Sequence, residues 1–502
     1  MAERRLGDRI MRSLMRDPDV IDDPLVLEYV SQIWARLLAG ARARGEIGPE
    51  LEASHAWQPF LVRDKSINAF ALPGGYIGVH LGLLAMTTSP DELASVLAHE
   101  LSHVTQRHIA RMIGQQSQQS WISIASLLLG VLAATRNAVA AQALIYGGQA
   151  AAIQNQLNFS RDMEREADRV GFGVLGDSGF DPAGMALMFE HLEAASRLND
   201  DGSWPYLRTH PLTTERIGEA HARLGPAAWS ALPSPLVTST AVWAQHQLMA
   251  ARARVLVDTR SEALQTLSTP QLPKQATRLQ TVTAWYMAGL ARQRAGQAEA
   301  ATQALATARE LAQGLPSLQQ DVLWRVLSLA QAEGQLRQRQ GQGRAALQTL
   351  QEALQRPGSI AKAQARPELL AQAHAALNIP EDADNHVVRD SALHEAASRL
   401  QTHVSDHPQD APAWSLLAEV WQALGQPVRA VRAEAEATAA LGDLPGAIDR
   451  VQGARKRFRQ PDTADVIELS VMDARMRAWQ RQLREDLRED GGGKGGGQGD
   501  GT

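Results

Sequence analysis

The chain has 502 residues, which is too long for one typical hydrophobic core, and we expect two or three domains. Its formal net charge of −5 gives no support to nucleic-acid binding. It contains no cysteine, which excludes disulfide bonds, zinc–thiolate sites and the chemistry of cysteine proteases.

The N-terminal part of the chain is predicted to be mostly helical. Aromatic residues make up 5% of the sequence, and the abundance of Ala, Leu, Gln and Arg favours helices over sheets. Asp23 and Pro24 start one helix within residues 1–60, whereas residues 57–79 alternate well enough for short strands. The first residues contain no apolar stretch typical of a secretory signal, so the protein is either cytoplasmic or begins downstream of a removed signal.

A helix is predicted over about residues 90–112. Ser89 is suited to be its N-cap and Pro90 its first residue, and acidic side chains follow in the first turn. Apolar residues then recur at the spacing of a buried helical face. A helix packed into a core in this way can hold a rigid site.

This helix carries a metal-binding motif of the HExxH form. His99 and His103 are four residues apart on one helical face, so both imidazoles can reach one metal ion. Glu100 lies about 100° round the helix, where its carboxylate can take a proton from a water bound to that metal. His108 is five residues beyond the second ligand and is predicted to lie off the ligand face, and His80 is predicted to be an ordinary histidine.

An uncharged segment follows the motif. Residues 112–135 carry no charged side chain, and a second weakly apolar stretch covers residues 138–153. Both are shorter than the roughly 20 residues that span a bilayer, so we expect a helical excursion over residues 112–153 rather than a transmembrane hairpin. It can cover the cleft, touch a membrane surface, bind a partner, or pack as a pair of helices in the core. We favour the first, because the excursion joins the two metal-binding segments.

A third metal ligand is expected from the acidic segment at residues 160–168. Catalytic zinc usually has three protein ligands and one open position. Glu164 and Asp168 are four residues apart on a predicted helix and share a face, so the first can bind the metal while the second holds the far nitrogen of a ligand histidine. Glu166 points to another side. The alternative is a solvated helix with Glu–Arg pairs.

Two further residues are candidates for the site. His210 precedes a proline and is therefore predicted to lie on an extended or turn segment. It can close the site as a fourth ligand, donate a hydrogen bond to the oxyanion of the tetrahedral intermediate, or simply order the loop. Arg216 can pair with a carboxylate near the site or form a structural ion pair.

From about residue 236 the sequence changes to Ala/Leu/Gln/Arg helices broken by Gly and Pro. Two segments align at identical offsets on the tetratricopeptide template, with Trp285, Ala288, Gly289, Gly296, Ala301 and Ala308 matching Trp414, Leu417, Ala418, Gly425, Ala430 and Ala437. Generic helical hairpins are the alternative. Stacked repeats form a solenoid whose concave face binds peptides or proteins. Residues 356–386 fit poorly and are predicted to join two groups of repeats.

Three segments resemble the zinc metallopeptidase family of the CaaX prenyl protease and HtpX. ExxAD at residues 164–168 begins 61 residues after the second histidine of HELSH, residues 68–77 resemble the family's strand beside the active-site helix, and residues 209–217 resemble its HPxxxxRI signature. The resemblance covers roughly residues 20–225. It implies one zinc ion in a gluzincin-type site, with Glu164 as a ligand and His210 close to the metal.

The resemblance and the repeats together imply a periplasmic protease. Its substrates would be misassembled outer-membrane proteins, and the repeats would recruit the substrate or the outer-membrane assembly machinery, with peripheral contact to a membrane surface. We expect a mostly α-helical chain: a metallopeptidase domain with a small β-sheet at residues 1–235, a tetratricopeptide-like solenoid at residues 236–485, and a disordered Gly-rich tail at residues 486–502.

The predicted function is that of a zinc-dependent endopeptidase. The proposed residues are the zinc ligands His99, His103 and Glu164, the general base Glu100, His210 beside the reacting atoms, and Asp168 and Arg216 as supports. The alternative is a chaperone or scaffold for membrane-protein assembly whose repeats do the main work, with latent proteolysis.

Overall fold

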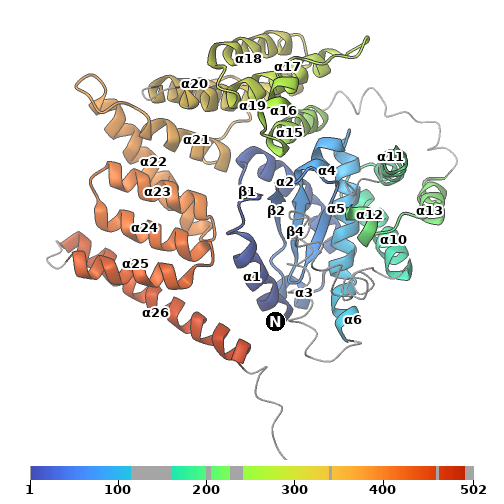
Figure 1. Ribbon diagram of the computed structural model, residues 1–502, viewed down its shortest axis with the longest axis horizontal. Coiled ribbons are helices and arrows are strands. Elements are labelled where there is room, and N and C mark those ends of the chain that lie inside the picture. The colour runs from blue at the N-terminus through green and yellow to red at the C-terminus, as the bar shows by residue number, and fades with distance from the viewer. Residues whose placement is uncertain are drawn as a thin grey trace, which may run out of the picture. The chain divides into compact units, whose positions relative to one another are not determined.

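The computed structural model describes residues 2–114, 161–198, 205–225, 241–338, 342–458 and 463–491. Helices dominate, a four-stranded sheet lies in the N-terminal part, and paired helices follow (Figure 1). The predicted fold class is thereby confirmed. The chain divides into two compact units, the first formed by residues 1–11 and 17–327 and the second by residues 12–16 and 328–502.

The sheet is mixed and has the strand order β1-β2-β4-β3. Its strands are β1 (Val20–Ile21), β2 (Gln58–Val62), β3 (Ala69–Leu72) and β4 (Tyr76–His80). The central pair β2/β4 is parallel, and the two outer pairs are antiparallel. Gly74 and Gly75 turn the chain from β3 to β4 with φ of 79° and 78°, a left-handed conformation that favours glycine. The edge strand β3 packs against helix α5 (Pro90–Thr105).

Helix α5 begins as the sequence predicts. The Ser89 hydroxyl accepts a hydrogen bond from the Glu92 backbone N–H, and Pro90 is the first helical residue. Every residue from Glu92 to Thr105 is buried, so core packing fixes the helix on all sides. The expected end near residue 112 is wrong. Helix α5 stops at Thr105, Arg107 takes a left-handed φ of 55°, and a separate helix α6 (His108–Gly114) follows.

Helix α10 (Arg161–Asp177) crosses α5 at close range. A Cβ atom at Gly171 would lie 3.2 Å from backbone atoms of Ala98 and His99, so only a glycine allows this approach without displacement. The short distance brings the acidic residues of α10 to the motif of α5. Around this pair lie α2 (Pro24–Ala43), α11 (Ala183–Leu198), α12 (Pro205–Thr209) and α13 (Thr214–Leu224).

Helix α15 (Ala241–Val257) packs on α4 (Leu81–Met86) and α2 within the first unit. Its buried His246 accepts a hydrogen bond at Nδ1 from the Tyr29 hydroxyl, 2.7 Å away, and donates from Nε2 to the Thr87 carbonyl at 3.1 Å. Burial lowers the pKa of His246 to about 4. The neutral imidazole is thus part of the packing of α15.

Lowering the pH is expected to destabilise the metal-free protein through protonation of His246. An unfolded histidine binds a proton below about pH 6.5, whereas folded His246 does so only below about pH 4. The free energy of unfolding should therefore fall by about 3 kcal/mol between these values as pH decreases. Denaturant unfolding at a series of pH values in EDTA measures this slope. His246→Gln should flatten it, whereas His191→Gln on the surface should not; equal slopes in all three proteins would contradict the assignment.

The two segments aligned on the repeat template form matching helix pairs. These are α17 (Arg278–Arg294) with α18 (Ala298–Ala312) in the first unit, and α23 (Ala411–Ala423) with α24 (Pro427–Ala440) in the second. Gly296 and Gly425 occupy the equivalent turns with φ of 75° and 69°, which explains the glycine at this offset. The other helices are α1 (Ala2–Leu14), α3 (Pro49–Ser54), α16 (Ser261–Leu267), α19 (Ser317–Arg337), α20 (Gly343–Gln355), α21 (Arg366–Leu377), α22 (His386–Asp406), α25 (Leu444–Arg457) and α26 (Thr463–Gly491).

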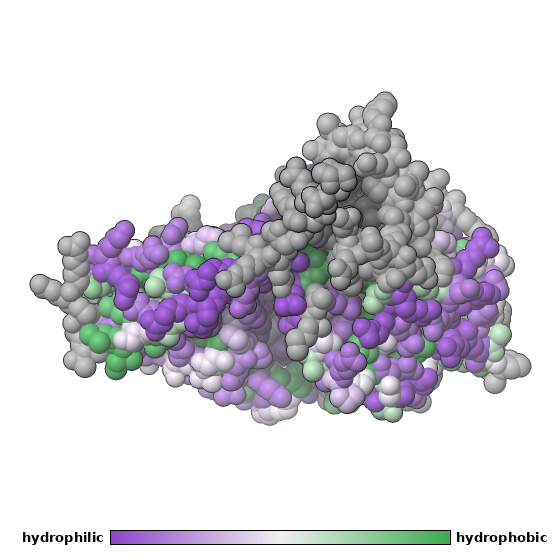
Figure 2. Space-filling model, turned by 90° about the horizontal axis from the view of Figure 1, so that it is seen from below, coloured by the Kyte–Doolittle hydropathy of each residue, from purple (hydrophilic) through white to green (hydrophobic). Residues whose placement is uncertain are grey.

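Two predictions concern segments that fall largely outside the described residues. Most of the excursion at residues 112–153 is among them. The disordered tail was predicted for residues 486–502, but α26 extends to Gly491, and the residues after it lie outside the described ranges. Among the helices that are described, none combines the length and the apolar character needed to span a bilayer. In the view of Figure 2 the coloured surface is mainly hydrophilic, and its hydrophobic residues form small separate groups.

Candidate active site

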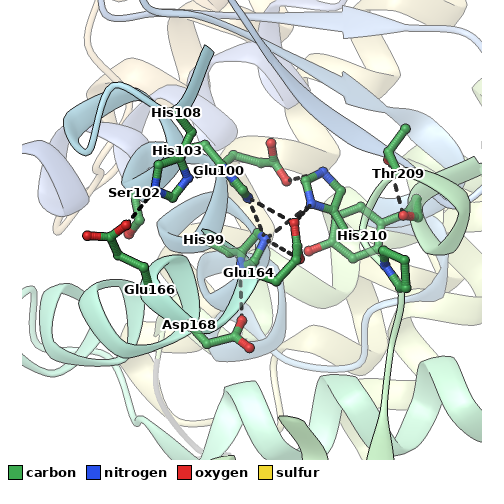
Figure 3. A network of polar contacts seen from close by, with 12 residues as sticks. His99, Glu100, Ser102, His103, His108, Glu164, Glu166, Asp168, Thr209 and His210 are labelled. Carbon is green, nitrogen blue, oxygen red and sulfur yellow. Dashed lines mark hydrogen bonds and ion pairs between the residues drawn. The ribbon is translucent and has the colours of Figure 1, made fainter. Parts of the chain in front are cut away.

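Four buried side chains from three segments converge on one point. They are His99 and His103 of α5, Glu164 of α10 and His210, which follows α12 (Figure 3). Each offers one possible ligand atom, and these four atoms all lie within 4.8 Å of one another. The structure thus brings together the two histidines and the carboxylate predicted as ligands, with His210 beside them.

The spacing of these atoms suits a tetrahedral metal ion. The Nε2 atom of His99 lies 3.0 Å from Nε2 of His103, 3.3 Å from Nδ1 of His210 and 3.4 Å from Oε2 of Glu164. Zinc with ligands at about 2.0–2.1 Å places them roughly 3.3 Å apart. Nitrogen and carboxylate oxygen are also ligand types that zinc accepts. The donor set therefore fits a single zinc ion.

The buried charges favour a cation at the same point. The site holds three buried carboxylates, those of Glu100, Glu164 and Asp168, and one buried guanidinium, that of Arg216, which pairs with the last two. Their sum is negative, and uncompensated charge is costly in a buried site. Oε1 of Glu100 makes no hydrogen bond within the described part of the chain. A divalent cation among these groups would neutralise the excess.

Asp168 and Arg216 lie behind the first histidine, at the positions predicted for supporting groups. His99 Nδ1–H donates to Asp168 Oδ1 at 2.9 Å, which leaves Nε2 directed to the cluster. Arg216 donates to both oxygens of Asp168 at 2.6 and 2.8 Å, and its Nη1 lies 2.9 Å from Glu164 Oε2. Thr213 caps α13 and so fixes the helix that carries this arginine.

Burial and neighbouring charges shift the pKa values of the cluster in opposite directions. Burial alone would lower the pKa of His99, but hydrogen bonds with Asp168 and Glu164 outweigh it and raise this pKa to about 9. Burial opposes ionisation of Glu164 too, yet His210 and His99 hold its pKa far below the usual range. Burial and the nearby imidazoles lower the pKa of His103. The carboxylate of Glu164 is thus kept ionised, as a metal ligand must be.

Glu100 has the environment of a general base. Burial raises the pKa of its carboxyl, which makes its carboxylate a stronger base than that of an exposed glutamate. The backbone N–H of Ala71 on strand β3 donates a hydrogen bond to it. Its Oε1 atom also lies 3.4 Å from Nε2 of His210. Glu100 is therefore placed between the edge strand and the four candidate ligands.

Two residues near the site were not predicted from the sequence. His108 is fully buried, and its Nδ1 lies 2.8 Å from Nδ1 of His103; it was expected off the ligand face only because α5 was expected to continue. Tyr206 is buried with its ring centroid 4.8 Å from that of His210. The position of His108 soon after the motif was a signal that could have indicated its role, whereas nothing in the local sequence pattern indicates Tyr206.

The comparisons with known proteins agree with this geometry. A helix with HExxH, a glutamate from a second helix and a buried glutamate base define a metallopeptidase. Residues 32–224 match the model described as peptidase family M48, so this part of the chain is similar to the members of that family.

Relatives match well beyond the site. The beta-barrel assembly-enhancing protease of Escherichia coli is 29% identical over 462 residues, which cover 91% of this chain and 84% of that protein. A Vibrio cholerae protein named as a candidate for the same activity is 39% identical over 217 residues, 43% of each chain. The mitochondrial metalloendopeptidase OMA1 of Arabidopsis thaliana is 34% identical over 163 residues, 32% of this chain and 30% of its own.

Proposed function

We propose that the chain is a zinc-dependent endopeptidase of the periplasm that hydrolyses misassembled outer-membrane proteins. The observation that carries the proposal is the buried cluster of His99, His103, Glu164 and His210 on an HExxH helix. The substrate class rests on the relatives named beta-barrel assembly-enhancing protease, one of which aligns with 91% of this chain. The periplasmic location rests on the same likeness.

The residues of the site divide the chemistry among them. His99, His103 and Glu164 would hold zinc, which when bound acidifies water and polarises the peptide carbonyl. Glu100 takes the proton of the attacking water and passes it to the amine nitrogen as the peptide bond breaks. Asp168, which accepts hydrogen bonds from Arg216, holds His99 in the orientation in which its Nε2 would be free to bind the metal.

The edge strand β3 provides a surface for an extended substrate. Among the described residues it pairs only with β4, and it packs against α5, so a peptide added to its other side would run along the catalytic helix. Backbone hydrogen bonds of this kind hold a chain without reading its sequence. Selectivity would then come from the helical repeats, which we propose to recruit the substrate or the assembly machinery.

His210 keeps the described arrangement closed. A catalytic zinc site needs three protein ligands and one open position, yet Nδ1 of His210 stands at the fourth position, 2.8 Å from Glu164 Oε1. Its Nε2 atom faces Glu100. We propose that His210 must leave before a peptide binds. This closure also favours the second candidate function, a scaffold for membrane-protein assembly whose protease activity is latent.

Opening the site is the test of the proposed function. We expect His210→Ala to retain about one zinc per chain and to cleave casein at least about tenfold faster than the wild type, since three ligands and a vacancy remain. A metal chelator should abolish cleavage by both proteins. Zinc content by mass spectrometry and the rate of casein cleavage are the measurements.

His221→Ala, which changes a histidine of the neighbouring helix α13, is the matched control and should behave as the wild type. Slower cleavage by His210→Ala with zinc retained would instead assign His210 to the oxyanion. If neither protein cuts casein or an unfolded outer-membrane protein while both bind the latter, the scaffold function is favoured. Absence of zinc from the wild type would refute the proposal.

A further inference from the structure

The ligand histidine His103 is bonded to a second histidine on the side away from the cluster. Its Nε2 faces His99 at 3.0 Å, and its Nδ1 lies 2.8 Å from Nδ1 of His108. Both side chains are buried, with 0% of each residue exposed. The short distance requires one of these two nitrogens to donate and the other to accept.

Metal binding decides which nitrogen donates. If Nε2 of His103 gives its lone pair to an ion, its single proton must sit on Nδ1. That N–H then donates to Nδ1 of His108, whose own proton is placed on Nε2. There it donates to Oε2 of Glu166 at 3.0 Å, which also accepts from Arg111 Nη1 at 2.8 Å. With this direction of donation, each ring nitrogen of His103 and His108 has a partner.

The backbone is shaped to allow this contact. In a continuous helix a residue five positions after His103 would lie off its face. The helix instead ends at Thr105, and Arg107 adopts φ 55°, a left-handed conformation that is strained for a non-glycine residue. Helix α6 therefore begins with His108 turned back onto α5. At the left of Figure 3, His108 and Glu166 lie beside His103 and outside the four candidate ligands.

We propose that His108, backed by Glu166, is a positioning residue that fixes the tautomer and ring orientation of the metal ligand His103. This inference rests on the proposed zinc site. It gives the second ligand histidine the support that Asp168 gives the first, with an imidazole inserted between ligand and carboxylate. Glu166, predicted to point elsewhere on α10, is the far end of this support.

Zinc affinity is the direct test, measured by competition with a chromophoric chelator. His108→Leu leaves the His103 N–H buried without an acceptor, and we expect the dissociation constant to rise about 10- to 100-fold, as for other groups that hold a ligand. His108→Asn restores an acceptor near the position of Nδ1 and should recover most of the affinity. Glu166→Gln, which is partly exposed, should weaken binding about three- to tenfold.

A matched control separates this role from general packing. His80→Leu removes another buried histidine of the same unit, one bonded to Ser66 and not to a ligand. It should leave zinc affinity within about twofold of the wild type. The cobalt(II) absorption spectrum adds a second readout, because a misoriented His103 in His108→Leu alters the ligand field whereas His80→Leu does not.

The outcomes distinguish this inference from the proposed function. If the wild-type protein binds no zinc, the proposed zinc site itself is refuted. A wild type that binds zinc, together with unchanged affinity and cobalt spectrum in both His108→Leu and Glu166→Gln, overturns the positioning role alone. Equal losses in His108→Leu, His108→Asn and His80→Leu would also overturn it, because they would indicate a packing effect. If His108→Leu does not fold, the Asn and Glu166 variants decide.

Discussion

Replacing Glu100 by glutamine is expected to reduce peptide hydrolysis by about 10²–10⁴-fold while zinc remains bound. Glutamine has nearly the same shape, but its amide cannot accept the proton of the attacking water. Glu100 is not one of the four residues whose possible ligand atoms lie close together, so metal binding should not depend on its carboxylate. The kcat/KM of the chain for a peptide substrate, paired with zinc content, measures both halves of the prediction. The loss should be easiest to measure when Glu100→Gln is combined with His210→Ala, because the His210→Ala variant is expected to have the highest activity.

A second buried glutamate of the same helix is the control for this variant. Glu92 lies at the start of α5, where its carboxylate accepts hydrogen bonds from Thr88. Glu92→Gln should cleave within about threefold of the parent, because it changes no group beside the reacting atoms. Full activity in the zinc-loaded Glu100→Gln variant would remove Glu100 from the mechanism. Loss of zinc from it would show that the carboxylate acts as a ligand.

Replacing Glu164 by alanine is expected to strip the metal from the site. Structural zinc sites with four ligands bind with about 10–16 kcal/mol, so the loss of one ligand should weaken affinity by at least about 10²-fold. The substitution also removes one of the two carboxylates that pair with Arg216, the one 2.9 Å away, and with it one of the buried negative charges that attract a cation. Zinc content after gel filtration should fall close to zero, and peptide cleavage should vanish with it.

The neighbouring Glu166 makes this test selective. Glu166→Ala should keep most of its zinc under the same conditions, because this carboxylate pairs with His108 and Arg111 and is not one of the candidate ligands. Adding excess zinc should restore activity to Glu166→Ala and not to Glu164→Ala. If only Glu166→Ala lost the metal, the third ligand would have been assigned to the wrong residue of α10.

The sequence predicts the elements of the site where local rules govern them. Ser89 and Pro90 start α5 as expected, and the four-residue spacings place His99 with His103, and Glu164 with Asp168, on single faces. The helix pairs around Gly296 and Gly425 follow from glycine at turns that need a positive φ. These features depend on residues close together in the chain, which is why one sequence suffices to find them.

Features set by tertiary packing were beyond the same reasoning. The end of α5 depends on a left-handed arginine at position 107, which no propensity favours, and the error at this point hid the contact between His103 and His108. The meeting of His210 with both Glu100 and Glu164 joins segments more than 45 residues apart, and only the resemblance to a known family indicated it.

The close crossing of α10 and α5 at Gly171 has a consequence for the stability of the zinc-free protein. At this crossing the backbone of α10 packs directly against the backbone of α5, and no side chain of residue 171 separates the two helices that carry the candidate ligands. Removing zinc therefore should not let them drift apart, in contrast to zinc fingers, whose fold collapses with the ion. We therefore expect that zinc can be removed from the folded protein and added back without a refolding step.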